Sequence, residues 1–139
     1  MNSPRKTRSA LAPTPSSQVL HVSVGETLEQ AAERAANTLQ ALQDGRPVSP
    51  YFGISFGEVG QLLGTFTPRR WELIAALREA GPLTIAALAR QLGRNYKNVH
   101  SDVAQLIEWM AVVRHDDGQV SVPWTQIVVD MMLPQRQAA

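Results

Sequence analysis

The chain has 139 residues, of which 44% are hydrophobic, and a formal net charge of +1. This length suits one small domain with an appendage, and the absence of cysteine excludes disulfides and thiolate metal sites. No apolar run approaches the roughly 20 residues of a membrane-spanning helix. The basic N-terminal residues are not followed by the apolar core of a secretory signal. We therefore expect a cytoplasmic protein.

Charge is distributed unevenly along the chain. Residues 1–18 contain three basic residues and no acidic one, residues 19–65 have an acidic excess of three, and residues 66–115 have a basic excess of three. We interpret residues 1–18 as a flexible basic tail, because they contain too few large apolar groups to offset the entropy of ordering, and residues 134–139 as a second tail. A locally basic segment such as 66–115 favours contact with phosphate groups.

Residues 19–65 are predicted to form a strand–helix extension. The β-branched run Val19–Val24 indicates a strand, Thr27 opens a helical pattern, and Gly45 ends it. One side of this helix is an apolar stripe, which consists of Leu28, Ala31, Ala32, Ala35, Leu39 and Leu42. The stripe fits either packing against the rest of the chain or contact with a dimer mate or partner, and the pattern does not separate the two. A second strand over Tyr51–Phe56 and a short helix over Glu58–Leu63 follow.

Residues 66–133 are predicted to form the second unit. Capping residues and glycines mark three helices, from Thr67 to Gly81, from Thr84 to Gly93 and from Asn95 to Met110. Two short strands within 112–123 surround Asp117-Gly118, a favoured hairpin pair, and a last strand covers Ile127–Leu133. Three helices with a glycine-containing turn, followed by a hairpin, are typical of a winged helix-turn-helix. The predicted fold class is therefore α+β, mainly α: a winged helix-turn-helix with an N-terminal strand–helix extension.

The third of these helices carries the predicted DNA-recognition face. Such a helix presents its N-terminal residues to base edges in the major groove, where amide and cationic side chains match the donors and acceptors of the bases. The candidate base-contacting residues are Arg94, Asn95, Tyr96, Lys97, Asn98, His100, Ser101 and Gln105. Asn98 or Gln105 suits adenine, and Arg94 or Lys97 suits guanine or a phosphate. The simpler interpretation of this polar face is a helix surface that only meets water.

Four further arginines are assigned to the phosphate backbone, where they would set orientation and give salt-dependent affinity: Arg69, Arg70, Arg90 and Arg114. The hairpin tip has Asp116 and Asp117, which repel phosphates, so the hairpin either touches DNA through Arg114, His115 or Gln119 or stays away from it.

The run Leu83–Leu106 resembles MarR-like winged helix-turn-helix transcriptional regulators. Three shorter motifs, Thr67-Pro68-Arg69-Arg70, the run from Leu92 to His100, and Val122-Pro123-Trp124, look like a family of small prokaryotic DNA-binding proteins of antitoxin-like type. The resemblance covers about residues 19–133, and the run Tyr-Lys-Asn-Val-His at 96–100 is its most specific part. It implies a homodimeric repressor that binds double-stranded DNA and regulates its own operon beside a toxin-like partner protein. A second hypothesis makes the extension a protein-interaction module that neutralises or recruits such a partner.

Other signals are set aside. Gly53-Ile54-Ser55-Phe56-Gly57 matches the G-x-S-x-G nucleophile motif, but that motif needs a hydrolase sheet for which this chain is too short. The three histidines lack the paired spacing of metal ligands, and the three tryptophans are interpreted as core or interface aromatics. We expect no enzyme activity, no metal and no cofactor.

Overall fold

A computed structural model describes residues 18–48 and 50–133. The two tails predicted at 1–18 and 134–139 lie outside the described residues, apart from residue 18. The elements follow in the order β1 (Val19–Val24), α2 (Leu28–Gln43), β2 (Phe52–Phe56), α3 (Val59–Thr65), α4 (Pro68–Ala80), α5 (Ile85–Leu92), α6 (Tyr96–Glu108), β3 (Val113–Arg114), β4 (Val120–Ser121) and β5 (Gln126–Met131). The fold is α+β and mainly α, as predicted.

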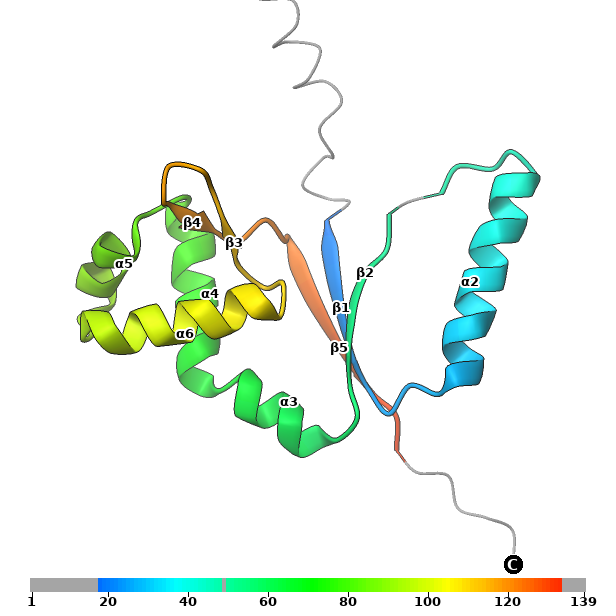
Figure 1. Cartoon of the computed structure of the whole chain (residues 1–139), viewed down its shortest axis with the longest axis horizontal. Helices are drawn as coiled ribbons and strands as arrows, with labels where there is room; N and C mark the ends of the chain where they lie inside the picture. Colours follow the sequence, from blue (N-terminus) through cyan, green and yellow to red (C-terminus); the bar gives the residue numbers. More distant parts are fainter. Residues whose placement is uncertain (1–17, 49, 134–139) are drawn as a thin grey trace, which may run out of the picture.

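A parallel three-stranded sheet in the order β2-β1-β5 forms the middle layer (Figure 1). Strand β1 pairs in parallel with both neighbours, so that Val22 faces Ile54 on one side and Val129 on the other. Parallel neighbours need a crossover connection, which α2 provides between β1 and β2. The third strand comes from the far end of the chain, so the sheet joins the predicted extension to the predicted second unit.

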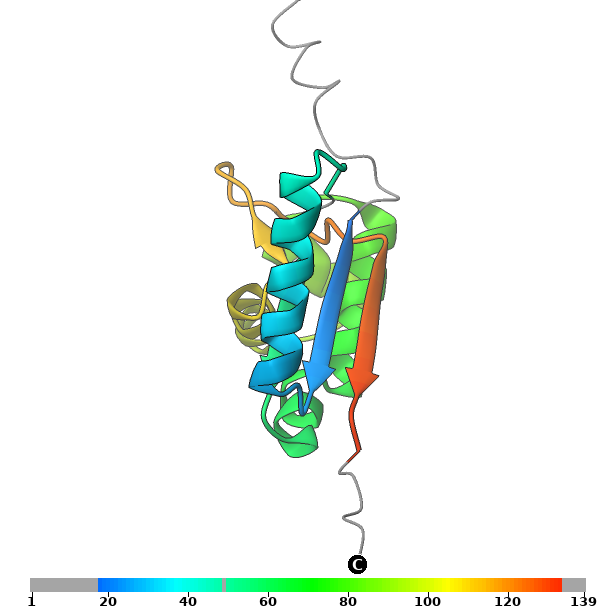
Figure 2. The same cartoon turned by 90° about the vertical axis from the view of Figure 1, so that its right-hand side faces the viewer.

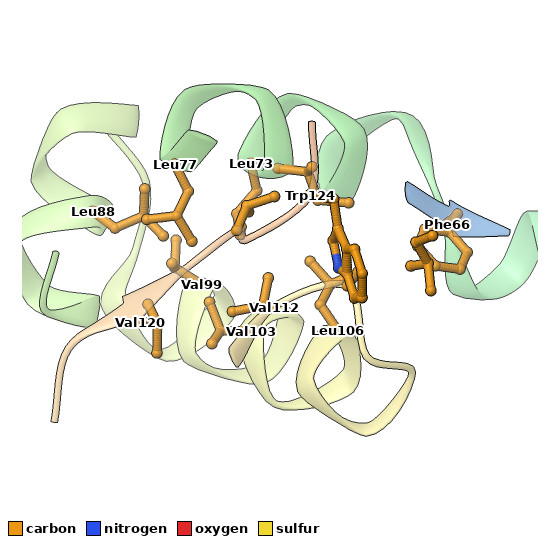
Figure 3. Close-up of a cluster of buried hydrophobic side chains, with 14 of the residues drawn as sticks. Phe66, Leu73, Leu77, Leu88, Val99, Val103, Leu106, Val112, Val120 and Trp124 are labelled. Atoms are coloured by element: carbon orange, nitrogen blue, oxygen red, sulfur yellow. The ribbon is translucent and has the colours of Figure 1, made fainter. Parts of the chain in front are cut away.

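The two faces of the sheet are covered differently. Helices α3 to α6 lie on one side, while α2 lies alone across the other side (Figures 1 and 2). Strand β1 buries Leu20, Val22 and Val24 against the multi-helix side, and Phe56 of β2 joins them. These residues belong to one hydrophobic core that continues between α4, α5, α6 and the β3–β4 hairpin (Figure 3). Aromatic rings connect the two parts, because Phe56 contacts Trp109 at 4.5 Å and Phe66 at 6.2 Å between centroids.

Local signals set most helix ends. Thr27 caps α2 in a reciprocal capping box with Gln30, and Thr67 accepts a hydrogen bond from the N–H of Arg70 at the start of α4. The helix predicted to run to Met110 is two residues too long, because α6 ends at Glu108 and Met110 has a left-handed φ of 70°. The N–H of Ala111 returns to the carbonyl of Leu106 at 2.9 Å, which closes this turn.

Within the described ranges, no helix is both long and apolar enough to cross a membrane.

Candidate nucleic-acid interface

The α5–α6 corner is built by a tight glycine turn. Gly93 ends α5 with a left-handed φ of 65°; its N–H donates to the carbonyl of Arg90 at 3.1 Å, and the N–H of Arg94 donates to the carbonyl of Ala89 at 3.0 Å. This pair of bonds is a Schellman motif, which satisfies carbonyls that the helix end leaves free. Ala89 is buried beside the turn and lets α6 approach closely. The corner therefore fixes the direction in which α6 leaves α5.

Replacing Gly93 with alanine is expected to lower the free energy of unfolding by about 1–2 kcal/mol, the usual cost of a left-handed conformation for an L residue. A Cβ at this position meets no atom within 4 Å, so backbone strain alone accounts for the loss. Chemical denaturation measures it. Gly64→Ala is the matched control, because its Cβ is also unobstructed and its φ is not positive; alanine should stabilise α3 slightly. Equal effects of the two substitutions would contradict the assignment.

Helix α6 buries one side and exposes the other. Val99, Val103 and Leu106 are buried in the core (Figure 3). Seven of the eight predicted base-contacting residues are exposed: Asn95, Tyr96, Lys97, Asn98, His100, Ser101 and Gln105. The structure thus places these seven at the surface, from the Asn95 cap to Gln105 in the third turn of α6.

Asn95 and Tyr96, at the start of this surface, differ in whether their side chains already form hydrogen bonds. The side-chain oxygen of Asn95 accepts hydrogen bonds from the N–H groups of Lys97 at 2.8 Å and Asn98 at 3.3 Å, so it caps the helix. The ring of Tyr96 lies 5.8 Å from that of His100 and is 52% exposed. The side chain of Tyr96 is accessible to a ligand, whereas the side-chain oxygen of Asn95 already accepts two hydrogen bonds.

Arg94 and Arg70 occupy a different environment from the other candidates. The Nη2 of Arg94 lies 2.7 Å from one carboxylate oxygen of Asp102, and the Nε of Arg70 lies 3.1 Å from the other. Arg70 also donates to the carbonyl of Thr65 at 2.8 Å. The three charged side chains are only 15–17% exposed. This Arg–Asp–Arg cluster ties α6 to the first turn of α4, so both arginines have an internal partner in addition to any role at a phosphate.

The remaining cations are available at the surface. Arg69, Arg90 and Arg114 are exposed, on α4, α5 and β3 respectively. The Nε2 of His115 lies 2.7 Å from the hydroxyl of Ser121, within the hairpin. Asp117 accepts a hydrogen bond from the N–H of Gln119 at 2.9 Å, which stabilises the turn at Gly118.

Sequence reasoning missed the role of Asp102, which it counted only as an acidic charge. Helix periodicity gives no signal for the contact with Arg94, because Arg94 lies in the turn before the Asn95 cap and not in α6. The contact with Arg70 joins residues 32 positions apart and has no local signal.

The G-x-S-x-G match lies elsewhere. Ser55 is inside β2, on the face of the sheet that α2 crosses, rather than in the turn that follows the strand. Among the described residues, no hydrogen bond joins Ser55 to a histidine, and no three metal-binding side chains gather in one place.

The fold and this surface define a small α+β protein whose second half presents a polar, partly cationic helix on a rigid helical corner. Residues 65–129, slightly less than half of the chain, match a family model described as HVO_A0114, so the chain is similar to that family over α4 to β5. None of the curated proteins matches the chain.

Proposed function

We propose that the chain is a sequence-specific double-stranded DNA-binding protein that acts as a dimeric transcriptional repressor of the MarR-like winged helix-turn-helix type. In this proposal α4, α5 and α6 are the three helices, α6 enters the major groove, and the β3–β4 hairpin is the wing. One observation carries it: seven polar side chains from the Asn95 cap to the third turn of α6 are exposed, while Val99, Val103 and Leu106 of the same helix are buried in the core.

The exposed cations are assigned by the helix that carries them. Lys97, on the first turn of α6, suits guanine or a phosphate, and Arg90 on α5 suits a phosphate beside the groove. Asn98 and Gln105 remain the candidates for adenine. Arg94 and Arg70 act through Asp102 as positioning residues for α6, because a guanidinium that already has a carboxylate partner contributes less net charge to a phosphate.

Titration of labelled DNA from upstream of the protein's own gene, at several salt concentrations, tests the proposal. We expect a specific complex whose affinity falls steeply with salt. Asn98→Ala should reduce discrimination at one base position by about 1–3 kcal/mol. Lys97→Ala should weaken binding and, if the contact is to a phosphate, reduce the salt slope by about one unit on every sequence.

Matched controls separate these effects from general damage. Gln61→Ala on α3 removes the same kind of amide, and Arg46→Ala removes a cation from the segment that follows α2, a helix on the opposite side of the sheet from α6 (Figure 1). Both should leave binding unchanged. Failure to form a specific complex, or equal losses in the control variants, would rule the proposal out.

A second candidate function, a module that binds a protein partner, is favoured by the exposed apolar stripe of α2. Co-purification with a neighbouring gene product, in the absence of DNA binding, would support it.

A further inference from the structure

Helix α2 turns its apolar stripe away from its own protein. Within residues 28–43 no side chain is buried, and Leu28, Leu39 and Leu42 are 86%, 56% and 60% exposed. A helix that connects two parallel strands ordinarily buries its apolar side on their sheet. Here the opposite, polar side of α2 lines a cleft over the sheet, with Gln30, Arg34 and Asn37 among its residues.

Specific contacts hold the helix in this orientation. Arg34 forms a bidentate ion pair with Glu26, and its guanidinium carbon lies 4.4 Å from the centroid of the Tyr51 ring. The Tyr51 ring stacks on His21 of β1 at 4.9 Å. A Cβ at Gly53 would come within 2.9 Å of the Tyr51 ring, so the glycine makes room for this stack. The hydrogen bond from Arg34, aided by its charge, lowers the pKa of the Glu26 carboxyl.

The sheet face under α2 offers the stripe few apolar partners. By the register of the strands, this face presents the polar residues His21, Ser23, Ser55 and Asp130 together with Val19 and Val128. Rolling α2 to bring its leucines onto this face would bury polar groups without partners and break the Arg34 contacts. The alternative that the stripe packs against its own chain is therefore disfavoured.

The stripe is complementary to a second copy of itself. Five of its residues recur at intervals of four and three, which is the spacing of a coiled-coil seam: Leu28, Ala32, Ala35, Leu39 and Leu42. Ala35 is at the middle. When two such helices run antiparallel around a two-fold axis at Ala35, Leu28 faces Leu42 of the second copy, and Leu39 faces the small residues Ala31 and Ala32. Small residues at the crossing let the two axes approach closely.

The helix dipoles favour the antiparallel arrangement. Antiparallel helices place the positive N-terminal end of one α2 beside the negative C-terminal end of the other, whereas parallel helices place like ends together. The side chain of Glu33 takes no part in this choice, because it lines the cleft over the sheet together with Asn37 and Ala41.

We propose that α2 is a homodimerisation helix, which pairs antiparallel with α2 of a second copy around Ala35. Helix α2 is only 16 residues long, so the interface belongs to the small class and the dimer dissociates on dilution. The inference rests on the proposed function in one respect: a two-fold DNA site requires a dimer, and α2 would supply the dimer contact.

Sedimentation velocity of the full chain over a range of concentrations, without DNA, tests the inference. The unmodified protein should change from monomer to dimer as concentration rises. Ala35→Glu should remain monomeric, because it places two carboxylates at the two-fold axis. Residue 35 is exposed in the single chain, so the variant should keep its helical circular dichroism and melting temperature. Gln40→Glu, which adds the same charge outside the stripe, should dimerise like the unmodified protein.

A mixing experiment makes the test specific for the two-fold axis. Ala35→Glu and Ala35→Lys proteins, each monomeric alone, should associate when mixed, because opposite charges then meet at the centre. A monomer at every concentration would overturn the inference, as would a dimer that Ala35→Glu leaves intact; the latter would indicate another surface, such as the free edge of β5. Because DNA is absent, these outcomes are independent of whether α6 binds DNA.

Discussion

Replacing Trp124 with alanine is expected to lower the free energy of unfolding by about 3–5 kcal/mol, the usual cost of removing a large buried aromatic side chain. Trp124 is 5% exposed, packs edge-on against Phe52 at 5.1 Å, and donates its indole N–H to the carbonyl of Met110 at 2.8 Å. It precedes β5 and contacts β2 and the end of α6 at once. The loss should therefore be large and should spread to the sheet.

Thermal and urea denaturation measure the stability of the Trp124→Ala variant, and hydrogen exchange shows where protection is lost. Trp124→Phe keeps an aromatic ring but removes the hydrogen bond, so it should cost about 1–2 kcal/mol. Tyr96→Ala removes an exposed aromatic and should change stability by less than about 0.5 kcal/mol. If Trp124→Ala lowered the free energy of unfolding as little as Tyr96→Ala does, the result would contradict the packing of Trp124 between the sheet and the helices.

The elements that could be predicted from the sequence are those set by local chemistry. Thr67, Thr84 and Asn95 each accept a hydrogen bond from an N–H group two or three residues later, and each was predicted to begin a helix. Gly93 and Gly118 have positive φ at the predicted turns. These signals need no knowledge of the rest of the chain, because a cap or a turn is satisfied within a few residues.

The pairing of the strands had no such signal. Strand β5 was predicted with nearly the right bounds, but its contact with β1 joins residues more than 100 positions apart, such as Leu20 and Ile127. A run of β-branched residues predicts a strand without naming its neighbour. The tie between the extension and the second half therefore became visible only in three dimensions.

The orientation of α2 also could not be predicted from the sequence. An amphipathic pattern states which residues share one side of a helix, but not whether that side meets its own core or another molecule. Here the contacts of Arg34 with Glu26 and Tyr51 set the orientation of α2. The contact with Tyr51 depends on the position of the Tyr51 ring, for which Gly53 leaves room.

Replacing Asp102 with alanine is expected to lower the free energy of unfolding by about 3 kcal/mol, because two guanidinium groups that are largely buried would lose their carboxylate. Asp116→Ala on the exposed hairpin tip changes the charge equally and should have little effect. Neutralising the arginines as well, in Asp102→Ala with Arg94→Met and Arg70→Met, should recover much of the loss, since the unpaired charges are then gone. If the triple variant did not regain stability, the loss in Asp102→Ala would not come from the two unpaired arginines.

The Asp102→Ala substitution also tests whether Asp102 positions α6 or contacts the bases of DNA directly. Asp102 contacts Arg70 of α4, so its removal is expected to loosen α6 without deleting one of the proposed DNA contacts. We expect Asp102→Ala to weaken DNA binding on every sequence while the preferred base at each position stays the same, whereas Asn98→Ala should change that preference. Binding assays on a set of single-base variants of the site, below the melting temperature of the variant, distinguish these results. A changed base preference in Asp102→Ala would place this residue, or the arginines it holds, in direct contact with the bases.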